Sequence, residues 1–195
     1  MMKIGLTGSI AVGKSFVLNI FKTRFKIPVF SSDACVKQIY AENSELKKFI
    51  KDEILERDAE FTNEDIADVV FKESDKLRKL EKFIHPLVKM RRDKFINQER
   101  KNESKFVVIE VPLLFEKKLE NEFDGVILVD TTDEIQEKRV MLRKKMDKEK
   151  YLNIKSNQMP SSEKIRKSDY IINNHDEATT IESVKYIIDE LNKKI

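Results

Sequence analysis

The sequence predicts an α/β domain in which a parallel sheet is covered by helices on both faces. Three observations lead to this prediction. Continuous apolar runs at residues 106–109 and 126–129 have the composition of strands buried on both faces. Segments with helical spacing alternate with such runs along the chain. A loop with glycines at both ends, residues 8–15, joins the first expected strand to the first expected helix.

The first elements are short and clearly bounded. Residues 3–7 form an apolar run that ends at Gly8, which predicts a buried strand. Residues 14–25 place Val17, Ile20 and Phe21 on one face of a helix. A second short strand is expected at residues 28–30, before Ser31-Ser32-Asp33.

The middle of the chain, from about residue 34 to 103, has helical patterns and no convincing strand pattern. Thr62 is expected to cap a helix, with Asp65 three residues later as a short-carboxylate variant of the capping box. Pro86 is expected to begin a further helix, because proline is tolerated in a first turn. We interpret this stretch as an all-helical insert in a core formed by residues 1–33 and 104–195.

After the insert, strand patterns return. Residues 134–146 predict a basic helix, and residues 170–172 a last short strand. The tail helix should place its apolar residues along one side, up to Ile195. The 195 residues suit one domain of this kind.

Composition narrows the class of partner. The chain has 38 basic and 35 acidic residues, a net charge of +3, so charge gives no argument for nucleic acid or an anionic membrane. The single cysteine, Cys35, precludes an internal disulfide and fits a reducing compartment. No apolar run reaches the roughly 18 residues of a spanning helix. Residues 2–12 lead into the loop without a signal-peptide cleavage site, so a cytoplasmic protein is expected.

The loop Gly8-Ser-Ile-Ala-Val-Gly-Lys-Ser15 matches the phosphate-binding pattern G-x-x-x-x-G-K-[ST]. Gly8 and Gly13 allow the backbone angles that turn N–H groups inward as an anion cradle. Lys14 can reach the β- and γ-phosphates of ATP, and the Ser15 hydroxyl can bind Mg²⁺. The base-reading Asn-Lys-x-Asp string of GTP switch proteins does not occur. A small-molecule phosphotransferase is therefore favoured.

Phosphoryl transfer also needs a carboxylate, and three residues compete for that role. Asp33 follows the second strand, where a ligand of a parallel sheet binds, and can take the proton of an acceptor hydroxyl and help to hold Mg²⁺. Capping of the next helix by Ser32 or Asp33 is the alternative. Asp130, which can also be a helix cap, and Glu110 end other strands. We rank Asp33 first, Asp130 second and Glu110 third.

Arg139 and Arg143 lie four residues apart on one face of the expected basic helix. Arginine can neutralise the charge that develops on a transferring phosphoryl group. A solvated charged face is the alternative interpretation, which Lys138, Lys144 and Lys145 support.

With these pieces placed, the chain resembles the dephospho-coenzyme A kinase family from end to end. The resemblance is carried by the phosphate loop, Ser32-Asp33, Phe83-Ile-His-Pro-Leu87, Val111-Pro-Leu-Leu-Phe-Glu116, Lys138-Arg139, Gln158 and Ser168-Asp-Tyr-Ile-Ile-Asn-Asn174. It implies transfer of the ATP γ-phosphate to the ribose 3′-hydroxyl of dephospho-coenzyme A. It also implies a P-loop kinase fold with a helical acceptor-binding insert and a small lid at about residues 139–166.

The resemblance assigns roles to particular residues. Lys14, Asp33 and Arg139 are expected to be catalytic, with Asp33 as the base. Ser15 and Asp33 are the expected Mg²⁺ ligands, and Asp33, His85 and Leu114 are placed at the acceptor, although Leu114 also fits a core position. The expected ATP-binding residues are Gly8, Ala11, Val12, Gly13, Lys14, Ser15, Phe16, Arg143 and Asn174, with Asn174 near the adenine.

The chain departs from the family pattern at three places. Ala11 and Val12 stand where the loop usually has more glycine, Ser31-Ser32-Asp33 replaces Asp-Ala-Asp, and His175-Asp176 replaces a glycine. The competing functions are another P-loop kinase, of the nucleoside monophosphate or shikimate type, and a regulatory module that binds nucleotide. The oligomeric state is left open.

Overall fold

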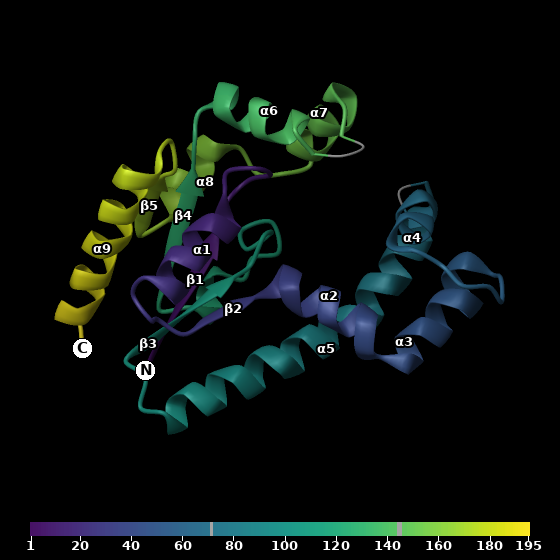
Figure 1. The fold of residues 1–195 in the computed structure, drawn as a ribbon, viewed down its shortest axis with the longest axis horizontal. Coiled ribbons are helices and arrows are strands. Elements are labelled where there is room, and N and C mark those ends of the chain that lie inside the picture. Colours follow the sequence, from purple (N-terminus) through teal and green to yellow (C-terminus); the bar gives the residue numbers. More distant parts are fainter. Residues whose placement is uncertain (71, 144–145) are drawn as a thin grey trace. The chain divides into compact units, whose positions relative to one another are not determined.

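The structure, a computed structural model, describes residues 1–70, 72–143 and 146–195. It divides into two compact units (Figure 1). Unit 1 combines Met1–Ser31 with Gln98–Ile195, and unit 2 is Ser32–Asn97. Each unit is described by itself below.

Unit 1 is built on a five-stranded sheet with the order β2-β3-β1-β4-β5. Every neighbouring pair of strands is parallel, with Leu6 opposite both Glu110 and Ile127. This arrangement confirms the predicted fold class. The strands are β1 (Met2–Thr7), β2 (Val29–Ser31), β3 (Phe106–Glu110), β4 (Gly125–Asp130) and β5 (Tyr170–Asn173).

Apolar side chains of successive strand residues are buried on opposite faces of the sheet. Ile127 and Val129 belong to a cluster that includes residues of α1 (Lys14–Thr23) and α9 (Glu177–Lys193). Val126 belongs to a second cluster with Leu114 and Phe115, against which Met159 packs. Residues of β4 thus belong to clusters on both faces of the sheet, which accounts for the unbroken apolar run of this strand.

The basic helix of unit 1 is shorter than the sequence suggested. The basic helix expected at residues 134–146 is α6 (Asp133–Met141) and ends five residues early. Leu142, which caps it, is 80% exposed, so its apolar side chain gains no packing that would favour extension of the helix. Then follow α7 (Lys148–Ser156) and α8 (Ser161–Lys167), and a short 3₁₀ turn, Glu120–Glu122, precedes β4. Lys144 and Lys145 lie outside the described residues.

Unit 2 contains helices and no strand among its described residues, as the sequence predicted for this stretch. It contains α2 (Ser32–Glu42), α3 (Ser44–Phe49), a π-helical turn (Ile50–Leu55), α4 (Asn63–Val70) and α5 (Ser74–Lys101), whose last four residues belong to unit 1. Its core contains Ile39, Leu46, Ile50, Ile54 and Ile84, all buried, and the rings of Phe49 and Phe83 stack with centroids 4.8 Å apart.

Two local predictions in unit 2 had different outcomes. The capping box is confirmed: the Asp65 carboxylate accepts from Thr62 N and Thr62 Oγ1, both at 2.7 Å, and Asp65 N donates to Thr62 Oγ1. The prediction that Pro86 begins a helix is wrong, because Pro86 lies inside α5. Proline removes the bond to the carbonyl of Lys82, but Lys82 and Pro86 are both exposed, so water can bind that carbonyl.

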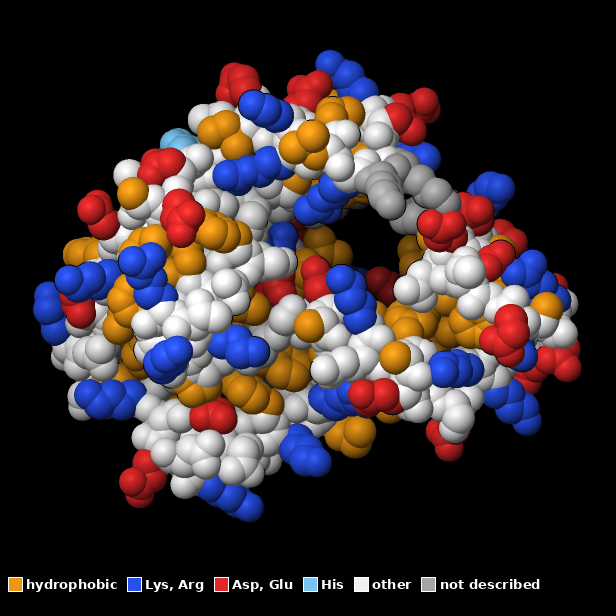
Figure 2. All heavy atoms as spheres, in the orientation of Figure 1, with side chains coloured by type: hydrophobic (Ala, Val, Ile, Leu, Met, Phe, Trp, Pro, Cys, Tyr) orange, Lys and Arg blue, Asp and Glu red, His pale blue; other side chains and the backbone are white. Residues whose placement is uncertain are grey.

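The surface is highly charged, and Lys and Arg side chains are interspersed with Asp and Glu on the face drawn in Figure 2. Ile195, expected on the apolar side of the tail helix, lies beyond the end of α9 and is 59% exposed. No helix in the described ranges has both the length and the apolar character that crossing a membrane requires.

Candidate active site

The loop of residues 8–15 connects β1 to α1 and has the backbone of a phosphate loop. Gly8 has a φ of 154° and Gly13 a φ of 96°. A Cβ atom at Gly8 would lie 2.3 Å from the carbonyl oxygen of Val129, and one at Gly13 would lie 2.0 Å from Asn174 Nδ2. Both positions therefore require glycine, for conformation and for space.

Ala11 shows where the loop departs from the family pattern. Its φ of 59° is left-handed, a conformation that glycine adopts without penalty and that costs an alanine roughly 1–2 kcal/mol. The Ala11 methyl group is buried with Val140 and Tyr151, which offsets part of this cost. The loop thus keeps a glycine-like backbone at a position where the side chain has a packing role.

The amino end of α1 supplies an anion site. Gly13 is its N-cap and has no side chain with which to cap the helix, and the first turn contains no acidic residue. The first N–H groups of a helix lack partners within the helix and carry partial positive charge. Ser15 and Phe16, in this first turn, are both exposed. The loop and helix end are therefore suited to a phosphate group.

The Lys14 ammonium folds back onto the loop rather than extending into solvent. Its Nζ donates to the carbonyl oxygens of Gly8 at 2.8 Å and Ser9 at 2.9 Å, and the residue is half-buried. Its charge is therefore held against the loop by these two carbonyls.

Arg139, on α6, lies against the same loop. Its Nη1 donates to Val12 O at 3.2 Å and its Nη2 to Asn174 O at 3.0 Å. Arg143, predicted on the same helical face, lies beyond the end of α6 and is exposed. The structure therefore brings Arg139 to the loop from a defined helix, whereas Arg143 is not held by that helix.

Asn174 is 2% exposed, and its side chain is hydrogen-bonded to the phosphate loop. Its Nδ2 donates to Val12 O at 2.7 Å, and its Oδ1 accepts from Thr180 Oγ1 at 3.1 Å. Its backbone N–H donates to the carbonyl of Asp130 at 2.8 Å, where β4 ends. The side-chain amide is thus bonded to protein groups, and its expected place near the adenine stays a prediction.

The carboxylates differ in burial. Glu110 is fully buried at the end of β3 and accepts from Ser31 Oγ at 2.5 Å. Asp130 ends β4, but the helix cap there is Thr132, whose Oγ1 accepts from Ile135 N, so the capping interpretation of Asp130 is wrong. Asp33 is exposed, in the first turn of α2, and follows the last residue of β2 by two positions.

Of the other residues considered from the sequence, Leu114 and Cys35 are buried and His85 is exposed. Leu114 has no exposed surface and packs with Phe115 and Val126, which is the core interpretation of this residue. His85 is exposed on α5 in unit 2. Cys35 is buried, and burial raises the pKa of its thiol, as suits a small apolar residue.

Sequence reasoning assigned no role to three polar residues that contact the loop. Gln136 Nε2 donates to Ile10 O at 2.5 Å, and Gln158 Oε1 accepts from Ile10 N at 3.0 Å. Lys164 is fully buried, with its Nζ 3.4 Å from Ser9 Oγ. Gln158 carried part of the family resemblance. Gln136 and Lys164 lie in charged helical stretches whose pattern gave no signal of burial.

The oxygen donors at this edge of the sheet suit a magnesium ion. Mg²⁺ prefers carboxylate, hydroxyl and phosphate oxygens, and the exposed Ser15 hydroxyl lies at the phosphate end of α1. Among the described residues, no group of three or more His, Cys, Asp or Glu side chains is arranged to hold a metal ion.

Comparison with known proteins decides the family. A family model described as dephospho-CoA kinase matches residues 2–180. The chain belongs to the dephospho-coenzyme A kinase family. A dephospho-CoA kinase of Bartonella quintana is 37% identical over 99% of this chain and 100% of its own length. One of Lactobacillus johnsonii is 37% identical over 88% of each chain.

Solved structures agree with this assignment. A dephospho-CoA kinase from Campylobacter jejuni is 26% identical, with a TM-score of 0.68 over 99% of this chain and 98% of that one. A protein from Thermus thermophilus has a TM-score of 0.78 at 30% identity, with 97% of each chain covered. Shikimate kinase from Aquifex aeolicus, at 15% identity and a TM-score of 0.54, shares the fold. The fold is thus that of P-loop kinases.

Proposed function

We propose that this chain transfers the γ-phosphoryl group of ATP to the ribose 3′-hydroxyl of dephospho-coenzyme A. The observation that carries the proposal is the phosphate loop, with glycine forced at residues 8 and 13 and the Lys14 ammonium already at the loop. Family membership names the acceptor. In the reaction the 3′-oxygen bonds to the γ-phosphorus, the bond from phosphorus to the β,γ-bridging oxygen breaks, and ADP leaves.

Lys14, the loop and α1 would bind the phosphates. N–H groups of the loop and helix end donate to phosphate oxygens, and Lys14 exchanges its bonds to two carbonyls for bonds to the β- and γ-phosphates. Ser15 and Asp33 would hold Mg²⁺, which when bound neutralises charge on these phosphates. Glu110 and Asp130 remain alternative carboxylates for that role.

Asp33 and Arg139 would act on the transferring group. Asp33 would accept the proton of the 3′-hydroxyl, which its exposed carboxylate and its position just after β2 support. The Arg139 guanidinium has five N–H donors, two of which bond Val12 O and Asn174 O. Because these bonds fix its plane beside the loop, its other donors can meet charge on the phosphoryl oxygens.

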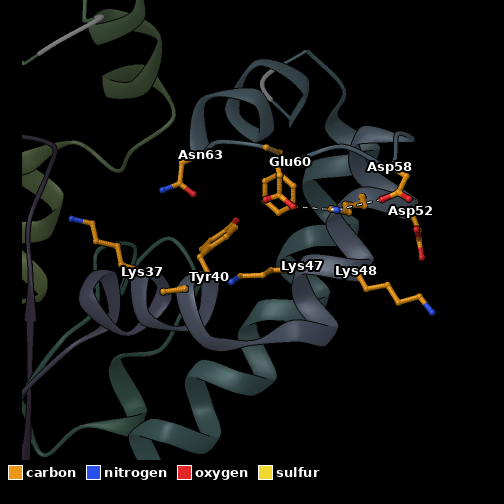
Figure 3. A pocket seen from close by; sticks show the side chains of 11 residues that line it. Lys37, Tyr40, Lys47, Lys48, Asp52, Asp58, Glu60 and Asn63 are labelled. Carbon is orange, nitrogen blue, oxygen red and sulfur yellow. Dashed lines mark hydrogen bonds and ion pairs between the residues drawn. The ribbon is translucent and has the colours of Figure 1, made fainter.

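A hollow in unit 2 supports acceptor binding by this unit. It has a volume of about 690 Å³, within the range of small-molecule sites, and its lining includes four lysines, three carboxylates and the rings of Tyr40 and Phe61 (Figure 3). Lys51 is paired there with Asp58 at 3.3 Å and Glu60 at 3.7 Å. Dephospho-coenzyme A carries a diphosphate and a long amide-containing arm. Lysines and aromatic rings suit those two parts.

Adjacent lysines provide a matched test of this hollow. Both lysines line the hollow, but in Figure 3 the Lys47 side chain runs toward Tyr40, whereas that of Lys48 extends away. Lys47→Ala should raise KM for dephospho-coenzyme A several-fold, Lys48→Ala should raise it less, and neither variant should change KM for ATP. Equal effects of the two variants would show that the hollow does not bind the acceptor.

The reaction itself is tested by incubating the protein with ATP, Mg²⁺ and a panel of acceptors. Coenzyme A should form from dephospho-coenzyme A, with ADP released in equal amount, and shikimate and nucleoside monophosphates should give no phosphorylated product. ATP binding without turnover stimulated by any acceptor would instead identify a regulatory nucleotide-binding module.

A further inference from the structure

Lys164 is a lysine with no exposed surface. Lysine is almost never fully buried unless its charge is paired. Its Nζ lies 2.9 Å from Glu116 Oε1 and 3.4 Å from Ser9 Oγ. Glu116 follows β3, Ser9 belongs to the phosphate loop and Lys164 lies on α8. The buried ammonium therefore joins three separate segments of unit 1.

Glu116 also binds the backbone that precedes α8. Its Oε1 accepts from Met159 N at 2.9 Å. Burial raises the pKa of the Glu116 carboxyl, but hydrogen bonds from Lys164 and from backbone N–H groups outweigh burial and lower the pKa overall. The carboxylate is therefore ionised at neutral pH. Since Met159 follows Gln158, the Lys164–Glu116 ion pair fixes the backbone that carries Gln158.

Gln158 and Gln136 hold opposite ends of one residue in the phosphate loop. Gln158 Oε1 accepts from Ile10 N–H at 3.0 Å, and Gln136 Nε2 donates to Ile10 O at 2.5 Å. Tyr151, 2% exposed, orients Gln136 by donating its hydroxyl to Oε1 at 3.1 Å. Ile10 immediately precedes Ala11, whose backbone is left-handed. Two amide side chains thus fix the backbone next to a strained residue.

We propose that Gln158 is a positioning residue for phosphoryl transfer, held in place by the buried Lys164–Glu116 pair. By occupying the Ile10 N–H, Gln158 keeps the loop in the conformation in which its following N–H groups face the phosphates. A loop displaced by even 1 Å can lose roughly 100-fold in rate, so a hydrogen bond outside the phosphate site can control catalysis. The catalytic consequence rests on the proposed function, whereas the effect on the loop does not.

Hydrogen exchange at the Ile10 amide tests the contact directly, in protein without nucleotide. Gln158→Met keeps the side-chain length but removes the acceptor oxygen, so Ile10 N–H should exchange roughly 5- to 10-fold faster. Gln158→Glu restores an acceptor oxygen and should return exchange to the wild-type rate. Asn157→Ala is the matched control, because the side chain of Asn157 bonds within its own turn, to Asn153. Unchanged exchange in Gln158→Met would overturn the proposal.

The ion pair is tested without leaving a buried charge. Lys164→Met alone would leave the Glu116 carboxylate buried without its partner cation, which is strongly destabilising. Glu116→Gln with Lys164→Met removes both charges together and keeps an amide oxygen for Met159 N–H. If the pair positions Gln158, this double variant should also speed Ile10 exchange, although neither residue touches Ile10. A folded double variant with wild-type exchange would overturn the role of the pair.

Binding and turnover separate this inference from the proposed function. Affinity for an unreactive ATP analogue with Mg²⁺ should fall roughly 10-fold in Gln158→Met and stay unchanged in Asn157→Ala. In turnover assays Gln158→Met should lower kcat/KM for ATP and leave KM for the acceptor unchanged. If wild-type protein phosphorylates no dephospho-coenzyme A, the proposed function fails, yet analogue binding and Ile10 exchange still decide the role of Gln158. Equal analogue affinity in Gln158→Met and wild type would overturn that role.

Discussion

Replacement of Asn174 by alanine should loosen the phosphate loop and destabilise the protein together. The buried side chain makes two hydrogen bonds, from Nδ2 to Val12 O at 2.7 Å and from Thr180 Oγ1 to Oδ1 at 3.1 Å. The first is worth about 1 kcal/mol. The second is worth less, because the Thr180 hydroxyl also lies 2.5 Å from Asp176 O and has one proton to share.

The hydrogen-bond partners of Asn174 keep other bonds in the variant, which limits the loss of folding free energy. Val12 O keeps its bond from Arg139 Nη1, and Thr180 keeps Asp176. With the small cavity left by the amide, we expect Asn174→Ala to lower the free energy of unfolding by roughly 2 kcal/mol. At this chain length that is a fall in Tm of roughly 4–8 °C.

Asn173 is the matched control for the assay. It is the same residue type, adjacent on β5, and exposed, so Asn173→Ala should stay within about 0.5 kcal/mol of wild type in urea unfolding. Asn174→Ala should also raise KM for ATP, since the Val12 carbonyl loses the shorter of its two side-chain hydrogen bonds. If Asn174→Ala raised KM for ATP but were as stable as Asn173→Ala in urea unfolding, loop positioning would be refuted. Direct contact of Asn174 with the adenine would then be favoured.

Three further predictions follow from the site and from unit 2. Lys14→Ala should abolish most turnover and lower the free energy of unfolding by about 1 kcal/mol, as two charge-assisted bonds to loop carbonyls are lost; wild-type turnover would exclude phosphate-loop catalysis. Asp33→Asn should lose roughly 10²–10⁴-fold in kcat with ATP affinity kept, and a larger loss in Asp130→Asn would reverse our ranking of the two carboxylates. Hydrogen bonds from the Thr62 backbone N–H and hydroxyl lower the pKa of Asp65 to about 2, so the cap should stabilise fully above the unfolded pKa of about 3.9 and fade as pH falls toward 2. Urea unfolding at several pH values should show this dependence in wild type and not in Asp65→Ala.

The sequence alone determined the features that depend on neighbours along the chain. The unbroken apolar runs predicted β3 and β4, and the helical spacing predicted an insert without strands. The spacing of Gly8, Gly13, Lys14 and Ser15 predicted the phosphate loop. Each position in this pattern needs a particular residue type, which can be recognised without knowing the rest of the fold. The capping box could also be predicted, because its two residues, Thr62 and Asp65, are only three positions apart in the sequence.

Other features were misjudged because tertiary packing decides them. Pro86 is tolerated inside α5 because it and Lys82, whose carbonyl it leaves unbonded, are on an exposed part of the helix where water can bind that carbonyl. The end of α6 at Met141 follows from the exposure of Leu142, which no local pattern reveals. Both outcomes depend on which face of a helix packs against other elements.

Only the tertiary structure revealed how the phosphate loop is held. Gln136, Gln158 and Asn174 lie more than a hundred residues from the loop in sequence and meet it because the parallel sheet brings its carboxyl ends to one edge. Lys164 looks like an ordinary surface lysine in a charged stretch, yet it is fully buried with Glu116. The sequence does not show which group a glutamine, asparagine or lysine side chain will bond, since the positions of both partners are set by the whole fold.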